Sequence, residues 1–163
     1  MKKNLRIVVF LAIAAVLLFS SPALTKDFDL APDFKLQDLY QDVFQLSDYK
    51  DKQPLILFFW TTWCPFCQNE LRVLNGMYPG ILKDGAALLS VDVGELPDTV
   101  ESFTNSYHLS YRVLLDRDTS MSRAYNAFGV PTYVLIDKKG RIIFSGNYFP
   151  QKEYKDLISG KYD

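Results

Sequence analysis

Cysteine and histidine are scarce in this 163-residue chain, which has two cysteines and one histidine. Two cysteines cannot form a framework of disulfide bonds, and they cannot supply the four thiolates of a structural zinc site. Basic residues are not in excess, because 18 Lys and Arg accompany 19 Asp and Glu. The chain therefore lacks the positive surface expected of a nucleic-acid-binding protein. Internal repeats and low-complexity segments are also absent from the sequence.

Apolar residues, in contrast, are plentiful. They make up 48% of the chain and include 12 Phe and 10 Tyr, enough for a substantial core in one domain. We interpret the aromatic residues mainly as core and expect neither a cofactor nor a metal.

The first 23 residues have the layout of a secretory signal peptide. A short positive start precedes the uninterrupted apolar run 7–19, and small residues up to Ala23 suit a signal peptidase. Cleavage after Ala23 and retention as an uncleaved membrane anchor both remain open. We therefore predict residues 1–23 as leader, 24–30 as tether and 31–160 as an extracytoplasmic domain. The membrane is expected to be contacted only through the N-terminal segment.

Both cysteines lie in one short motif, Cys64-x-x-Cys67. The apolar run 55–59 before it has the length of a buried strand, and the apolar spacing after Glu70 is that of a helix face. The cysteines are therefore expected at a helix N-terminus, where unpaired backbone N–H groups and the helix dipole stabilise a thiolate. We predict Cys64 as an accessible, acidic nucleophile and Cys67 as the resolving thiol. Pro65 suits the first helical turn.

The remaining pattern predicts strands alternating with helices, hence an α/β sheet covered on both faces. A hairpin is expected over 31–46. Pro79-Gly80 is expected to interrupt the cysteine helix, and a later helix is expected over 119–128. The three polar residues His108, Asp116 and Asp137 are interpreted as surface, capping or turn residues rather than catalytic ones.

The sequence resembles the thioredoxin superfamily, and more narrowly the extracytoplasmic TlpA/ResA-like reductases, over residues 31–158. The resemblance rests on three motifs: Trp60-x-x-Trp63-Cys64-Pro65-Phe66-Cys67-x-x-Glu70, Val130-Pro131-Thr132 and the opening Ala31-Pro32-Asp33-Phe34. It implies a thioredoxin-like α/β fold. That fold has a central mixed β-sheet flanked by helices, an N-terminal β-hairpin and an inserted strand and helix.

The resemblance also implies roles for residues around the cysteines. Pro131 would follow a cis peptide bond and lie against the cysteine pair, leaving the Val130 backbone to pair with a client strand. Pro131 could instead simply begin a strand. Glu70 would exchange a proton with Cys67, although an ordinary first-turn glutamate is the alternative. Trp63, Pro65 and Phe66 would contact the client, whereas Trp60 is expected in the core.

These features predict an exported thiol–disulfide oxidoreductase that reduces client proteins and is recharged by a membrane thiol electron donor. By resemblance, the clients include apocytochrome c or other secreted proteins. A peroxiredoxin-like thiol peroxidase is one alternative, because Thr61-x-x-Cys64-Pro65 resembles the cysteine motif of that family. Leu57, however, stands where that family has a proline. A copper metallochaperone is the other alternative, but His108 is distant in sequence from the cysteines.

Overall fold

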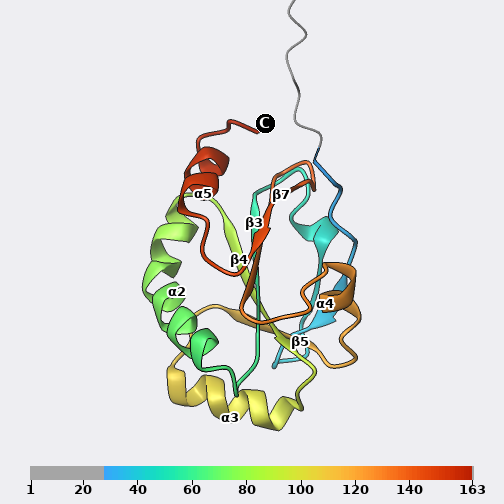
Figure 1. Ribbon diagram of the computed structural model, residues 1–163, viewed down its shortest axis with the longest axis vertical. Coiled ribbons are helices and arrows are strands. Elements are labelled where there is room, and N and C mark those ends of the chain that lie inside the picture. Colours follow the sequence, from blue (N-terminus) through green and yellow to red (C-terminus); the bar gives the residue numbers. More distant parts are fainter. Residues whose placement is uncertain (1–27, 163) are drawn as a thin grey trace, which may run out of the picture.

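The computed structural model describes residues 28–162, which form a five-stranded mixed sheet with helices on both faces and an N-terminal hairpin (Figure 1). The hairpin and the sheet comprise β1 (Lys35–Gln37), β2 (Val43–Gln45), β3 (Leu55–Trp60), β4 (Ala87–Val93), β5 (Arg112–Asp116), β6 (Thr132–Ile136) and β7 (Ile142–Gly146). The helices are η1 (Leu46–Asp48, a 3-10 turn), α2 (Pro65–Lys83), α3 (Pro97–Tyr107), α4 (Ser120–Ala124) and α5 (Gln151–Ile158). The predicted mixed α/β architecture and the hairpin are confirmed.

Strand β3 is the centre of the sheet, whose order is β5-β4-β3-β6-β7. It pairs in parallel with β4 and antiparallel with β6, and all six of its residues are buried. A strand with partners on both edges and helices on both faces has no solvent-facing side, which explains why its sequence is uniformly apolar. Its C-terminal end leads directly into the cysteine motif.

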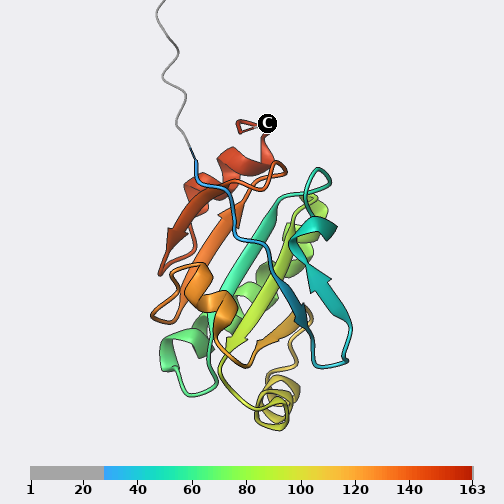
Figure 2. The same cartoon turned by 90° about the vertical axis from the view of Figure 1, so that its right-hand side faces the viewer.

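Alternate residues of β3 belong to two separate hydrophobic clusters. Ile56, Phe58 and Trp60 face the side covered by α2, α3 and α5. Leu55 and Leu57, with Phe59, face the side covered by the hairpin, η1 and α4. Figure 1 shows α2 and α5 on one side of the sheet and α4 on the other. Figure 2 shows the hairpin lying beside the β5 edge, where Asp38 bridges Leu114. The sheet is therefore covered on both faces, as predicted.

The cysteine helix α2 runs through Pro79 to Lys83, so the predicted interruption at Pro79-Gly80 is wrong. An interior proline removes one backbone hydrogen bond and costs about 3 kcal/mol. The apolar stripe of α2 continues beyond it, because Leu74 and Ile81 are both buried in the same cluster. Packing of the last turn against the sheet thus outweighs the local penalty.

The helix predicted over 119–128 is shorter than expected, because α4 ends at Ala124. Asn126 adopts a left-handed backbone conformation with φ of 55°, which an α-helix cannot accommodate. The chain then turns toward Phe128 and the Val130-Pro131 segment. This early ending brings that segment back to the cysteines.

The two ends of the described chain meet far from the cysteine motif. The Phe28 and Tyr162 rings pack edge to face with centroids 5.6 Å apart, and Arg141 contacts both residues. Figure 1 shows this end of the molecule opposite the N-terminus of α2. The predicted leader, 1–23, lies outside the described residues. Among residues 28–162, no helix is both long and apolar enough to cross a bilayer.

Candidate active site

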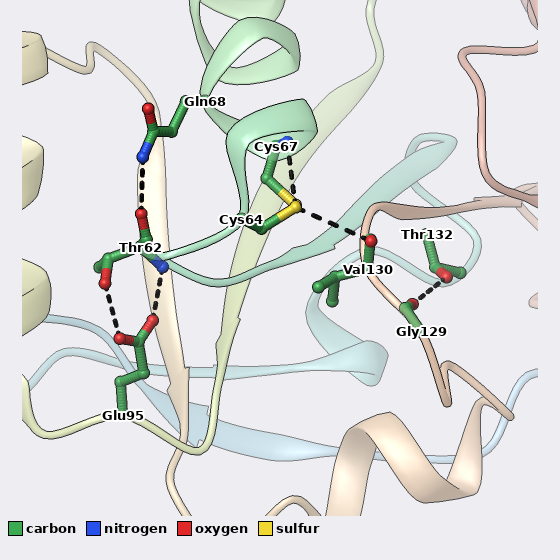
Figure 3. Close-up of a disulfide and its surroundings, with 8 residues drawn as sticks. All are labelled: Thr62, Cys64, Cys67, Gln68, Glu95, Gly129, Val130 and Thr132. Atoms are coloured by element: carbon green, nitrogen blue, oxygen red, sulfur yellow. Dashed lines mark hydrogen bonds between the residues drawn. A yellow bond between two sulfur atoms is a disulfide. The ribbon is translucent and has the colours of Figure 1, made fainter.

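Cys64 and Cys67 form a disulfide at the first turn of α2, with Cα atoms 5.2 Å apart. Cys64 is the N-cap residue, and its Sγ accepts a hydrogen bond from the Cys67 backbone N–H at 3.2 Å (Figure 3). Pro65 occupies the start of the helix, where its lack of an N–H leaves no hydrogen bond unmade. The geometry therefore places a donor on the sulfur at the positive end of the helix dipole, an arrangement that favours the thiolate once the disulfide is reduced.

Both cysteines are buried in this disulfide form, so the expectation of an accessible Cys64 is wrong for the oxidised protein. Cys64 is 3% exposed and Cys67 is 0% exposed. The neighbouring Trp63 and Phe66 are 70% and 77% exposed. The reason is the direction of the helix start, which turns the cysteines toward the core and the Val130 loop and turns the flanking aromatic residues outward.

The Val130–Pro131 peptide bond is cis, as the resemblance predicts. The Val130 carbonyl oxygen lies 3.8 Å from Cys64 Sγ, so this loop covers one side of the disulfide (Figure 3). Thr132 Oγ1 donates to the Gly129 carbonyl at 2.7 Å and closes the loop on itself. The loop therefore presents defined backbone groups next to the sulfur.

Glu70 accepts a hydrogen bond from the Tyr133 hydroxyl at 2.6 Å. Burial, together with this hydrogen bond, raises the pKa of Tyr133 well above its usual range. The hydroxyl therefore keeps its proton and remains a donor. Glu70 lies on α2, one turn after Cys67, and this hydrogen bond holds its side chain against β6.

A surface cavity of about 730 Å³ lies beside the disulfide. Its lining combines five of the predicted site residues with four others: Pro65, Phe66, Asn69, Glu70, Gly129, Val130, Pro131, Thr132 and Asn147. Trp63 is not among the lining residues. A larger cavity, of about 960 Å³, lies between the hairpin and the β4–α3 loop, and no residue of the cysteine motif or of the cis-proline loop lines it. The smaller cavity is the relevant one for chemistry at Cys64, because it is lined by Pro65 and Phe66, the two residues between the cysteines, and by Val130, whose carbonyl oxygen faces Cys64 Sγ.

Several residues at this end of the molecule were not predicted from sequence. Thr62 is hydrogen-bonded to Glu95 from the β4–α3 loop, and Phe128, just before the cis-proline loop, is 80% exposed. The buried Asp92 lies at the end of β4. Burial, followed by the neighbouring Glu95 carboxylate, raises the pKa of Asp92 to about 8. A carboxyl group inside a largely apolar strand was the available signal, but the hydrogen bond that Asp92 receives from Glu95, three residues on, is visible only in the fold.

The other polar candidates are structural. Asp116 accepts the backbone N–H groups of Met121 and Ser122, and Asp137 pairs with Arg141. His108 is an exposed C-cap residue of α3. Residues 28–162 contain no group of three or more His, Cys, Asp or Glu side chains placed to hold a metal ion.

Comparison with known proteins identifies the family. Residues 29–145 match the AhpC/TSA family. The thiol-disulfide oxidoreductase ResA of Geobacillus kaustophilus is 37% identical over 153 residues, which is 87% of each chain. ResA of Geobacillus thermodenitrificans is 39% identical over 112 residues, which cover 69% of this chain but only 64% of that relative.

The solved structures agree with the fold. The crystal structure of a putative thiol:disulfide interchange protein DsbE from Chlorobium tepidum has a TM-score of 0.72. At 24% identity it covers 85% of this chain and 99% of that one, which supports the thioredoxin-like fold. This chain therefore belongs to the AhpC/TSA family, as a thioredoxin-like relative of the ResA thiol-disulfide oxidoreductases.

Proposed function

We propose that this chain is an extracytoplasmic thiol–disulfide oxidoreductase that reduces disulfides in client proteins. The observation that carries the proposal is the position of the Cys64–Cys67 disulfide, at the N-terminus of α2 and 3.8 Å from the Val130 carbonyl of the cis-proline loop. The ResA relatives support the reaction class.

The reaction is a two-electron exchange of disulfide bonds. The Cys64 thiolate attacks one sulfur of a client disulfide, forms a mixed disulfide and releases the other client sulfur as a thiolate. The Cys67 thiolate then attacks Cys64 Sγ, releases the second client thiol and leaves the Cys64–Cys67 disulfide. A dithiol donor, proposed to be a membrane thiol carrier, attacks that disulfide in turn and restores both thiols.

Individual residues are proposed to assist these steps. The exposed Trp63 and Phe66 contact the client, while Pro65 shapes the cavity wall. The Val130 backbone beside Pro131 pairs with an extended client segment, which would bring the client cystine to Cys64. Glu70 takes the proton of Cys67 during the resolving step.

Export, clients and direction belong to the same proposal. The leader-like sequence of residues 1–23 and the ResA relatives support export. The chain enters the domain at the end opposite the cysteines, so a tether attached to a membrane would leave the cysteine end free for clients (Figure 1). Apocytochrome c and other secreted disulfide proteins are the proposed clients.

A trapping experiment tests the proposal directly. Cys67→Ala, expressed in the native cell, should accumulate mixed disulfides at Cys64 that mass spectrometry identifies, and Cys64→Ser should accumulate none. Purified reduced protein should reduce a protein disulfide stoichiometrically. A reduction potential near that of a strong oxidant, about −120 mV, would contradict the reducing direction.

A thiol peroxidase is the second candidate, because the AhpC/TSA match covers most of the chain. Rapid turnover of hydrogen peroxide that is lost in Cys64→Ser and retained in Cys67→Ala would favour it. Slow peroxide consumption alongside fast disulfide reduction would exclude it.

A further inference from the structure

Thr62 occupies the turn between β3 and α2, two residues before Cys64, and each of its polar groups is hydrogen-bonded. Its backbone N–H and its Oγ1 both donate to the Glu95 carboxylate, at 2.6 and 2.7 Å. Its carbonyl oxygen accepts from Gln68 Nε2 at 2.9 Å (Figure 3). The segment that leads into Cys64 is therefore held from two directions, by the β4–α3 loop and by α2.

Glu95 is anchored in turn by a buried carboxyl group. Its backbone N–H donates to Asp92 Oδ1 at 3.3 Å. Asp92 is 1% exposed and lies beside Trp60 of the parallel strand β3. The side chains of Asp92 and Trp60 therefore point to the same face of the sheet, the face that α2 covers. Burial raises the pKa of Asp92 to about 8, so the carboxyl group that anchors Glu95 is mostly protonated at neutral pH.

The opposite side of the turn is anchored on α2 and α3. Gln68 Oε1 accepts from the Tyr107 hydroxyl at 3.1 Å, and that hydroxyl accepts from Arg72 at 3.1 Å. Arg72 also lies over the Tyr107 ring. The network thus joins α2, the β4–α3 loop and α3 at the residue that precedes Trp63 and Cys64.

We infer that Glu95 is a positioning residue for the cysteine pair, because its two hydrogen bonds to Thr62 set the backbone from which Trp63 and Cys64 project. The inference rests on the proposed function in one respect, namely that Cys64 is the attacking thiol. Attack on a disulfide requires the thiolate to approach along the sulfur–sulfur axis, and a displacement of about 1 Å at a reacting atom can reduce a rate about 100-fold. Without Glu95, two donors of Thr62 lose their acceptor and the turn loses one of its two attachments.

Paired substitutions separate geometry from charge. In a Cys67→Ala background, where Cys64 is the only thiol, we compare Glu95→Ala with Glu95→Gln, whose amide can still accept from the Thr62 N–H and donate to its Oγ1. Thr62→Val and Thr62→Ser form the second pair. Glu101→Ala, at an exposed position on α3, is the matched control for loss of a glutamate. The readouts are the rate of mixed-disulfide formation with a peptide disulfide and the alkylation rate of Cys64 by iodoacetamide at pH values where the thiolate is fully formed.

Glu95→Ala and Thr62→Val are expected to lower the rate with the peptide disulfide by about tenfold or more, because both disturb the geometry of attack. Glu95→Gln, Thr62→Ser and Glu101→Ala are expected to stay within about threefold of the parent, and Glu95→Ala combined with Thr62→Val should be clearly non-additive. The inference is overturned if Glu95→Ala lowers the unfolding midpoint while the folded molecules react at the parent rate. It is also overturned if Glu95→Gln is as slow as Glu95→Ala. If the parent reacts with no disulfide, the proposed function fails. The alkylation rate of Cys64 in Glu95→Ala, compared with the rate in Glu95→Gln, still decides whether Glu95 positions the thiol.

Discussion

The Glu70 carboxylate on α2 and the Tyr133 hydroxyl on β6 are joined by a hydrogen bond of 2.6 Å. Tyr133 follows the cis-proline loop by two residues, and its ring packs on Phe58 with centroids 4.6 Å apart. The bond therefore ties the beginning of the cysteine helix to β6, the strand that follows Pro131. It also fixes Glu70 at the wall of the cavity beside the disulfide.

This relationship predicts a graded effect on the resolving step. Glu70→Ala should slow the release of a client from its mixed disulfide by about 100-fold or more, because a positioned acid–base group typically contributes about 10²–10⁴-fold. Tyr133→Phe should slow it less, because Glu70 remains but loses its orienting donor. Stopped-flow measurement of client release, with formation of the mixed disulfide followed separately, distinguishes the steps. Equal rates of release in all three proteins would show that Glu70 takes no part in proton transfer.

Selective alkylation tests the reactivity of Cys64. In the reduced protein, Cys64 should react with iodoacetamide about tenfold or more faster than Cys67, because the Cys67 N–H and the helix dipole stabilise its thiolate. Its apparent pKa should lie below about 8.5, the value of free cysteine. Peptide mapping after brief labelling gives the comparison. Preferential labelling of Cys67 would contradict the roles assigned to the two cysteines.

Asp92 predicts a pH dependence of stability with a definite sign. Its pKa is raised from 3.8 to about 8 in the fold, chiefly by burial and then by Glu95, with Asp116 also contributing. Between these two pH values the unfolded chain releases the proton and the folded chain keeps it. Folding therefore loses stability as pH rises through this range, with a slope approaching about 1.4 kcal/mol per pH unit from this group.

Asp92→Asn removes that titration. The difference in unfolding free energy between Asp92→Asn and the parent should rise from pH 4 to pH 8 and then level off, as urea denaturation at a series of pH values would show. Asp29→Asn, an exposed position, serves as the control. Parallel stability curves for parent and Asp92→Asn would contradict the assignment.

Pro79 predicts a stabilising substitution. The proline is exposed and interrupts the hydrogen bonds of α2 without ending the helix. Pro79→Ala should raise the unfolding free energy by about 1–3 kcal/mol and leave disulfide reduction unchanged, because it restores one backbone hydrogen bond four turns from Cys64. Gly76→Ala, with open space around the added methyl group, should raise the unfolding free energy by about 0.5–1 kcal/mol. It serves as the reference against which the effect of Pro79→Ala is compared. A loss of stability in Pro79→Ala would mean that the backbone conformation imposed by Pro79 is needed for the packing of Ile81.

Much of the fold was predictable because local patterns agreed with tertiary packing. The run Leu55–Trp60 is apolar on both faces, and the structure places it at the centre of the sheet with both faces covered. The alternation after Ala31 correctly predicted the hairpin. The two errors, at Pro79 and beyond Ala124, arose where a local signal competed with more distant contacts. Because Ile81 is buried against the sheet, α2 continues past Pro79. The left-handed backbone of Asn126 ends α4 before the predicted residue.

The sequence by itself determined the chemistry of this protein: two cysteines, two residues apart, between an apolar strand and an amphipathic helix. Spacing within one turn is a local property, so it can be read without the fold. Only the tertiary structure decided what surrounds those sulfurs. Val130, Glu95 and Tyr133 reach the cysteine turn from other strands and loops. The reason is that β4 runs parallel and β6 antiparallel to β3, which places the end of β4 and the start of β6 beside the end of β3. The burial of Cys64 and the hydrogen bonds of Thr62 depend on those long-range contacts, which no local pattern encodes.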